Sequence, residues 1–177
     1  MRQNKQNVSA KSNEQRNAYV IEHITNAFLD LLAEMPIENI SISDLTSKAG
    51  VGRASFYRNY TRKEDVLLMH INRLFTEWTT EQEKNPDAPL SEQVRTMIAH
   101  FEKHRDFYEL LNKRELTYML KDSIIGMCGP KPEYDMMQAY ASSFAAYTLY
   151  GWIDTWFTRG MCETSDELAA LFKAQGL

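Results

Sequence analysis

Apolar residues recur at helical spacing along most of the chain, beginning with a segment from about residue 14 to residue 34. Pro36 follows this segment and stops a helix, because proline lacks a backbone donor and crowds the turn before it. The segment predicts an amphipathic first helix. Residues 1–13 are polar and basic without periodicity, which is typical of a disordered tail or of an arm that contacts phosphate. The apolar positions of the helix are Val20, Ile21, Ile24, Ala27, Phe28, Leu31 and Leu32.

Two short helical patterns meet at a glycine in the stretch 41–65. Ser41 and Asp44 have the spacing of a capping box, which predicts a second helix over about residues 42–49. Gly50 comes just after its end, where the chain needs a left-handed residue and glycine adopts one at the lowest cost.

Two further helices follow the turn at Gly50. A third helix is predicted from residue 52 or 53 to about residue 60, and Thr61 with Glu64 predicts a second capping box that opens a fourth helix. The apolar face of the fourth helix is Val66, Leu67, Ile71, Leu74, Phe75 and Trp78.

Breakers at 84–89 and at 129–132 separate the remaining helical patterns. No alternation typical of strands and no internal repeat is found. We therefore predict an all-α fold of about nine helices, with a three-helix head over residues 14–75 and a helical body over residues 76–177. The later helices are predicted over 90–103, 107–111, 114–128, 133–161 and 164–174.

Charge is divided unequally between these two parts. The chain has a net charge of −4, but residues 1–75 hold ten Lys and Arg against eight Asp and Glu, and residues 76–177 hold ten against sixteen. The window 45–63 has five basic residues and no acid. A basic head on an acidic body is an electrostatic pattern in which the head alone would face nucleic acid.

Several classes of protein are disfavoured by composition. The apolar runs are shorter than the roughly 18 residues that a membrane span needs, and the first residues lack the apolar core of a secretory signal. Cys128 and Cys162 lie far apart in the chain, which indicates a reducing, cytoplasmic setting. We find no nucleophile elbow or phosphate loop and predict no enzyme activity and no cofactor.

Helices two and three together have the pattern of a helix-turn-helix. The inner positions Leu45, Ala49, Val51 and Phe56 have the spacing to pack the two helices together. In such a unit the second helix lies in the major groove, where arginine grips guanine and hydroxyl groups serve bases or phosphates. A purely structural helical corner with a solvated basic face is the alternative. The outer positions are Arg53, Ala54, Ser55, Tyr57 and Arg58.

The run A-G-V-G-R-A-S-F-Y-R-N-Y-T-R-K-E-D-V-L closely resembles the TetR family of bacterial transcriptional regulators. Gly52 replaces the usual serine cap of that family, Ala54 a common glycine and Asn59 the usual aromatic residue. The resemblance covers about residues 17–78. The final region, from Tyr150, is similar to a subgroup that includes the activator of dihydroxyacetone kinase expression.

The resemblance implies a homodimer that binds a palindromic operator on double-stranded DNA and responds to an unknown small-molecule effector in the body. A repressor is the expected type of regulator. The alternative is a TetR-fold coactivator, an adaptor that a protein partner regulates. Carried over residue by residue, the expected DNA contacts are Ser41, Ser43, Arg53, Ala54, Ser55, Tyr57, Arg58 and Lys63.

Positions in the body are expected from the same resemblance. The long helix near the C-terminus mixes small and aromatic residues, which fits either an internal core helix or half of a dimer interface. The expected effector pocket is lined by Trp78, Phe101, Tyr108, Tyr118, Met119 and Phe144, although each of these could equally be a core residue. The expected dimer interface is Ala141, Ala145, Thr148, Trp152, Trp156, Leu168 and Leu171.

Two further features have chemical interest. His100 and His104 are four residues apart, which is the spacing of two metal ligands on one helix face, but the spacing marks no third ligand. We therefore predict a solvated or capping role and no metal site. Cys162 lies near a helix end and is interpreted as a structural cysteine, with a redox-sensitive thiol as the alternative.

Overall fold

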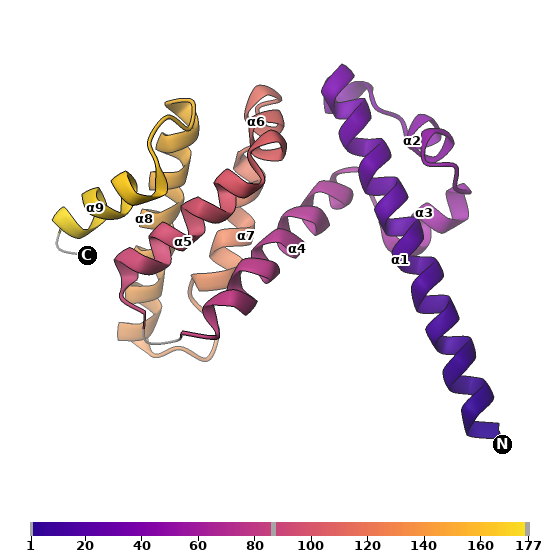
Figure 1. The fold of residues 1–177 in the computed structure, drawn as a ribbon, viewed down its shortest axis with the longest axis horizontal. Helices are drawn as coiled ribbons and strands as arrows, with labels where there is room; N and C mark the ends of the chain where they lie inside the picture. The colour runs from indigo at the N-terminus through magenta and orange to yellow at the C-terminus, as the bar shows by residue number, and fades with distance from the viewer. Residues whose placement is uncertain (1, 86–87, 176–177) are drawn as a thin grey trace. The chain divides into compact units, whose positions relative to one another are not determined.

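The computed structural model describes residues 2–85 and 88–175, except for the side chains of residues 2–12 and of Leu90. Nine α-helices and one 3₁₀ helix form this described part, and it holds no strand, so the all-α prediction is confirmed (Figure 1). No helix in the described ranges has the length and apolar character needed to cross a membrane. The polar arm expected over residues 1–13 lies, apart from Asn13, outside the described side chains.

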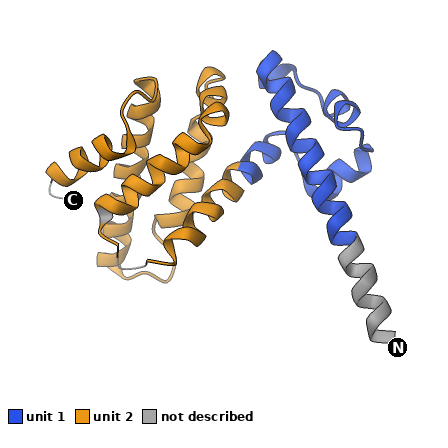
Figure 2. Cartoon of the chain, in the orientation of Figure 1, with its two compact units in different colours: residues 1–70 blue, residues 71–177 orange. Residues whose placement is uncertain are grey.

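The chain divides into two compact units, which we call the head (residues 1–70) and the body (residues 71–177) (Figure 2). The division falls inside α4, Glu64–Gln82. The sequence placed the boundary slightly later, after residue 75 of the same helix. One continuous helix therefore begins in the head and ends in the body.

The head packs the apolar stripe of α1 against α2 and α3. Ile24 and Phe28 of α1 are fully buried, as are Leu45 of α2 and Phe56 of α3. These four side chains occupy the inner positions that the helical spacing predicted, and burial of each stabilises the head by roughly 1.5–3 kcal/mol. The elements of the head before α4 are α1 (Arg2–Glu34), η1 (Ile37–Asn39), α2 (Ile42–Lys48) and α3 (Arg53–Asn59).

Local caps set the ends of these short helices. The Ser41 hydroxyl accepts a hydrogen bond from the Asp44 N–H at 3.1 Å and begins α2 as predicted. Gly50 follows α2 with a φ of +66°, the left-handed conformation that favours glycine. The predicted Thr61–Glu64 capping box is wrong. The Asp65 carboxylate, and not that of Glu64, accepts the N–H groups of Thr61 and Arg62, at 2.8 and 2.7 Å.

The body is built from the second half of α4 and five further helices. In it α5 packs along α9, α7 packs along α8, and α6 contacts both α5 and α8. Glu115 has a left-handed φ of 58°, and the chain turns there, so that α7 begins later than predicted. The elements are α5 (Leu90–Lys103), α6 (Arg105–Lys113), α7 (Tyr118–Cys128), α8 (Met136–Thr158) and α9 (Ser165–Ala174).

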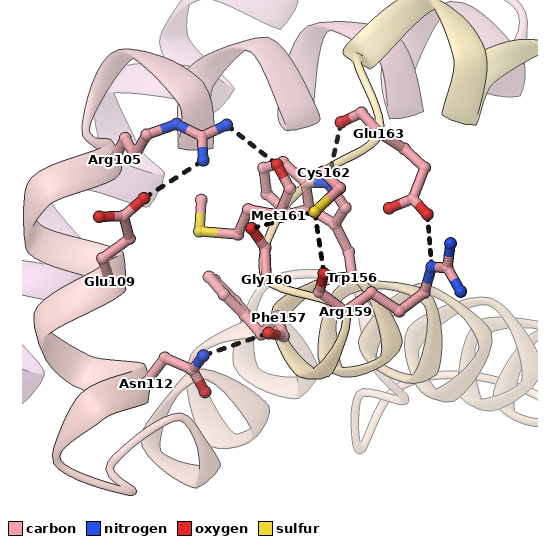
Figure 3. Close-up of polar contacts among 10 residues, drawn as sticks. All are labelled: Arg105, Glu109, Asn112, Trp156, Phe157, Arg159, Gly160, Met161, Cys162 and Glu163. Carbon is pink, nitrogen blue, oxygen red and sulfur yellow. Dashed lines mark hydrogen bonds and ion pairs between the residues drawn. The ribbon is translucent and has the colours of Figure 1, made fainter.

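Side chains that donate hydrogen bonds to backbone carbonyls stabilise the turn between α8 and α9 (Figure 3). Asn112 and Arg105 of α6 donate to the carbonyl oxygens of Phe157 and Met161, both at 3.1 Å. The Trp156 indole N–H donates to the Glu163 carbonyl at 2.9 Å. Because buried carbonyls otherwise lose water without compensation, these bonds fix where α8 ends and α9 begins.

Candidate functional site

The outer face of α3 carries two exposed arginines, Arg53 and Arg58. Phe56 is fully buried and anchors the helix, while Arg53, Arg58 and Tyr57 are exposed, the last to 51%. Ala54 is also exposed and Ser55 is half-buried. A helix held by one buried aromatic residue presents its opposite side to solvent, so the sequence-predicted contact residues of α3 lie together on the solvent side.

The arginines of α3 differ from Lys48 of α2 in their partners. Lys48 lies 3.3 Å from Glu34 and 3.8 Å from Asp30, so its charge is balanced within the head. Among the described residues, Arg53 and Arg58 have no acidic group within ion-pair distance. Their charge is available to an external anion.

Two of the expected DNA contacts, Ser41 and Ser43, are at the N-terminus of α2. Ser41 and Ser43 are both exposed, as a phosphate contact requires. The Ser41 hydroxyl is occupied within the head, because it caps α2 and donates to the Asp44 carboxylate at 2.6 Å. Among the described residues, no side-chain hydrogen bond engages the Ser43 hydroxyl.

Lys63 has a role that its spacing did not indicate. Its ammonium group donates to the carbonyl oxygens of Ile37, Glu38 and Ile40, with the latter two at 3.2 and 2.8 Å. An ammonium group has three hydrogens, and these three carbonyls use all of them. Lys63 therefore holds the connection between α1 and α2 against the start of α4.

A cavity of about 380 Å³ opens in the body between α4, α5, α7, α8 and α9. Among the residues that the structure describes, no charged side chain lines it. Its polar atoms are largely occupied: Trp78 donates to Thr96 at 3.2 Å, Gln93 to the Ala88 carbonyl at 2.9 Å and the Cys128 thiol to the Ile124 carbonyl at 3.2 Å. The lining is Trp78, Gln82, Gln93, Val94, Met97, Met127, Cys128, Phe144, Ala145, Thr148, Leu149 and Phe172.

Two of the six residues expected in an effector pocket, Trp78 and Phe144, line this cavity. Phe101 and Tyr108 are fully buried, with their rings 4.4 Å apart, in an aromatic cluster with Trp156 and Phe157. Met119 is 8% exposed and Tyr118 is 60% exposed, and neither contributes to the lining.

The residues expected in a dimer interface lie on α8 and α9 in three different environments. Ala141 and Leu171 are exposed, while Ala145 and Thr148 line the cavity. Trp156 and Leu168 are buried inside the protomer. A second hollow, of about 300 Å³, is lined by Trp152, Thr155, Trp156, Arg159, Glu163, Leu168 and Leu171.

α8 carries a stripe of exposed apolar side chains that the sequence did not predict to be exposed. Met137 is 73% exposed, Tyr140 76%, Phe144 63% and Tyr147 51%. Their spacing of three and four residues was visible in the sequence, but the whole helix is apolar, so spacing alone could not separate an outer face from an inner one. We call these four residues the α8 stripe.

The histidine pair lies against α4. The rings of His100 and His104 are 4.8 Å apart, and among the described residues neither Nε2 atom has a hydrogen-bond partner. The pKa of His100 is lowered to about 4, mainly by burial; the charges of His104 and Lys103 contribute to the lowering, and Glu77 opposes it. Within the described part of the chain, no group of three metal-binding side chains includes this pair. Cys162 is exposed, and its thiol donates to the Arg159 carbonyl at 3.1 Å.

The helix-turn-helix geometry and the free arginines of α3 define a DNA-binding domain. The family model of the bacterial regulatory proteins of the tetR family matches residues 24–69. This match covers about a quarter of the chain and includes α2, α3 and the start of α4, so this part of the head is similar to the helix-turn-helix domain of that family.

A curated protein is similar to this chain over a short stretch. The uncharacterized HTH-type transcriptional regulator YxbF of Bacillus subtilis (strain 168) is 45% identical over 53 residues, which are 29% of this chain and 14% of that protein. The match thus spans about a seventh of the relative.

Two crystal structures show the same fold over nearly the whole chain. Lin0861 from Listeria innocua has a TM-score of 0.73 at 16% identity, over 92% of this chain and 91% of that one. A TetR transcriptional regulator from Streptococcus agalactiae 2603V has a TM-score of 0.61 at 19% identity, over 94% and 98%.

Proposed function

We propose that this protein is a homodimeric repressor that binds a palindromic operator in the cytoplasm. In each copy α3 would lie in a major groove, with Arg53, Ala54, Ser55, Tyr57 and Arg58 toward the DNA. The observation that carries this proposal is the exposed face of α3, whose two arginines have no acidic partner among the described residues. Ser41 and Ser43 at the start of α2 would contact the backbone, and Lys63 would position the head.

Selection of bound duplexes from a random library tests the operator proposal. We expect an inverted repeat whose half-sites are separated by about 10–10.5 bp or a multiple of it, because two symmetric heads must enter grooves on one side of the duplex. A reporter placed behind the recovered site should be silenced by the protein. Recovery of no shared motif would refute sequence-specific binding.

The α8 stripe supports the dimer. Tyr140 and Met137 are more than 70% exposed, and an exposed apolar stripe at the spacing of a helix seam is typical of a surface that packs on another helix. A C₂ dimer pairs the same patch of both copies. We therefore propose that two α8 helices, together with α9, form the interface.

The cavity supports a small-molecule effector, and its lining limits the charge of that molecule. A charged ligand would lose its hydration in an apolar site and find no opposite charge there. We propose a neutral, mainly apolar effector with a polar end near Gln82 or Thr148. Trp78 and Gln82 belong to α4, the helix that begins in the head, so α4 would carry the signal to the DNA-binding unit.

A matched set of naphthalene compounds tests the charge of the effector. Naphthalene-2-methanol should quench Trp78 fluorescence, while 2-naphthoate and 2-naphthylmethylammonium should not. In a Gln82→Glu variant, which keeps the shape of the side chain, the ammonium compound should become the preferred ligand. Equal binding of all three compounds by the unchanged protein would contradict a neutral effector.

The adaptor remains a second candidate, in which another protein covers the α8 stripe. Its support is the exposure of that stripe and the similarity of the C-terminal region to the subgroup that includes the activator of dihydroxyacetone kinase expression. A protein that forms no homodimer and binds none of the naphthalene compounds would favour the adaptor over the effector-controlled repressor.

A further inference from the structure

The face of α1 that packs on the head continues beyond the core and changes character. Ile24 and Phe28 are fully buried on this face. Going back by three or four residues at a time, the same face carries Val20, then Asn17 and then Asn13. Val20 and Asn17 are half-buried and Asn13 is exposed. The inner face of α1 therefore becomes polar where the apolar core ends.

This polar part of α1 forms a groove with the recognition helix. A hollow of about 550 Å³ is lined by Asn13, Glu14, Arg16, Asn17 and Val20 of α1 and by Arg58 of α3. We call it the α1–α3 groove. Arg58 thus belongs to two surfaces, since it lies on the outer face of α3 and also closes one wall of the groove.

The chemistry of the groove suits an anion. Arg16 and Arg58 supply two guanidinium groups, and the two asparagines supply amide donors. Among the described residues neither arginine has an acidic partner within ion-pair distance, and Glu14 is the one acidic side chain in the lining. Two unbalanced guanidinium groups from helices far apart in the sequence leave a net positive charge in one hollow, where a phosphate oxygen can accept several hydrogen bonds.

We propose that the α1–α3 groove binds a backbone phosphate of the operator, beside the bases that α3 contacts. This proposal rests on the proposed function, because it extends the DNA surface of the head beyond the helix-turn-helix. Arg58 would link the two parts of the surface, and Arg16 would contact backbone alone. A backbone contact fixes how deeply and at what angle α3 enters the groove, but it reads no sequence.

The test compares Arg16→Ala with Lys113→Ala, an equal change of charge at an exposed position of the body. Affinity for the selected operator and for an unrelated duplex is measured across a series of KCl concentrations. Arg16→Ala should weaken both affinities about threefold or more at about 100 mM salt. The slope of log affinity against log salt should become shallower by about 0.9 for each copy that loses a phosphate contact, and Lys113→Ala should leave it unchanged.

A second variant is expected to change DNA affinity in the opposite direction. Glu14→Gln removes the acidic side chain of the groove and should tighten binding to both duplexes, with the preference for the operator kept within about twofold. Thermal unfolding of each variant confirms that the head is folded.

The outcomes separate the two proposals. If the unchanged protein binds the operator, and Arg16→Ala and Glu14→Gln both behave like Lys113→Ala, the groove binds no phosphate while the proposed function stands. If the unchanged protein binds no duplex, the proposed function fails and the groove proposal fails with it.

Discussion

Helix α3 of the head and helix α8 of the body differ in how much apolar surface they leave exposed. In the head, α3 buries Phe56 completely and exposes mostly polar and charged side chains. In the body, α8 also buries aromatic residues at its C-terminal end, but it leaves Tyr140 76% exposed and Phe144 63% exposed. The α8 stripe is therefore an apolar surface of the body that the protomer itself does not cover.

The difference leads to opposite expectations for how salt affects the two proposed associations. Covering apolar surface contributes about 25 cal/mol per Å², so the α8 stripe gains by association with another apolar surface. The free arginines of α3 gain instead by meeting anions, and salt screens that attraction. Association through the body should therefore be insensitive to salt, while binding through the head should weaken steeply as salt rises.

The largest effect is expected from charges placed on the α8 stripe. Met137→Arg with Tyr140→Arg should weaken the dimer by at least about 100-fold, because central apolar residues of an interface often contribute about 2 kcal/mol each. Sedimentation equilibrium measures the change, and affinity for the full palindrome should fall toward that for a single half-site.

Tyr118→Arg is the matched control for these two substitutions. Tyr118 begins α7 and is 60% exposed, so one arginine, half the charge of the double variant, is added at an exposed aromatic position outside the stripe. A double variant that dimerises as tightly as the control would show that the stripe is not the interface.

The next largest effect is expected from substitutions on the outer face of α3. Arg53→Ala should weaken operator binding by about 10- to 100-fold, since one bidentate arginine contact with guanine is worth roughly 1–3 kcal/mol. The preference for one base of each half-site should relax at the same time. Tyr57→Ala should also weaken binding strongly. Unchanged affinity of both variants in gel-shift titrations would contradict the placement of α3 in the major groove.

Sequence reasoning succeeded where structure depends on neighbours along the chain. The spacing of Ser41 and Asp44 and the position of Gly50 specify a cap and a turn within a few residues, and both are found where predicted. Asp65 shows the limit of this reasoning. Two adjacent carboxylates could each cap α4, and only the fold selects the one that reaches both free amides.

Sites that join distant segments could not be predicted in the same way. Phe101 and Phe144 are both aromatic residues at helical spacing, yet one is fully buried and the other lines a cavity. Gln82 and Gln93 were missed because nothing in their local pattern brings α4 and α5 together at a cavity wall. Lys63 bonds a carbonyl 26 positions earlier, a partner that no short motif reveals.

A smaller effect separates two roles of Lys63. Lys63→Met keeps the length of the side chain but removes all three hydrogen bonds, which should destabilise the head by about 1–3 kcal/mol. Urea unfolding followed by circular dichroism measures this loss. If Lys63 positions the head, the folded variant should keep the salt dependence of DNA binding. A shallower salt slope with unchanged stability would instead identify a direct phosphate contact.

The smallest effect concerns the pH dependence of the body. Folding holds His100 neutral, because burial lowers its pKa from its ordinary value of 6.5 to about 4. Between pH 6.5 and pH 4, His100 takes up a proton in the unfolded chain but not in the folded chain. Its contribution to the free energy of unfolding is therefore fully present above pH 6.5 and is lost as the pH falls toward 4. The loss from this group should be of the order of 1 kcal/mol between pH 6.5 and pH 5.

Tryptophan fluorescence can isolate this effect, because Trp78, Trp152 and Trp156 all lie in the body. The groups around His100 are His104 and Lys103, whose charges also lower its pKa, and Glu77, whose charge raises it. Since a glutamine cannot take up the proton, His100→Gln should flatten the decline in stability below pH 6.5, and His23→Gln in the head should leave it unchanged. Equal slopes for His100→Gln and the unchanged protein would show that His100 does not couple protonation to the folding of the body.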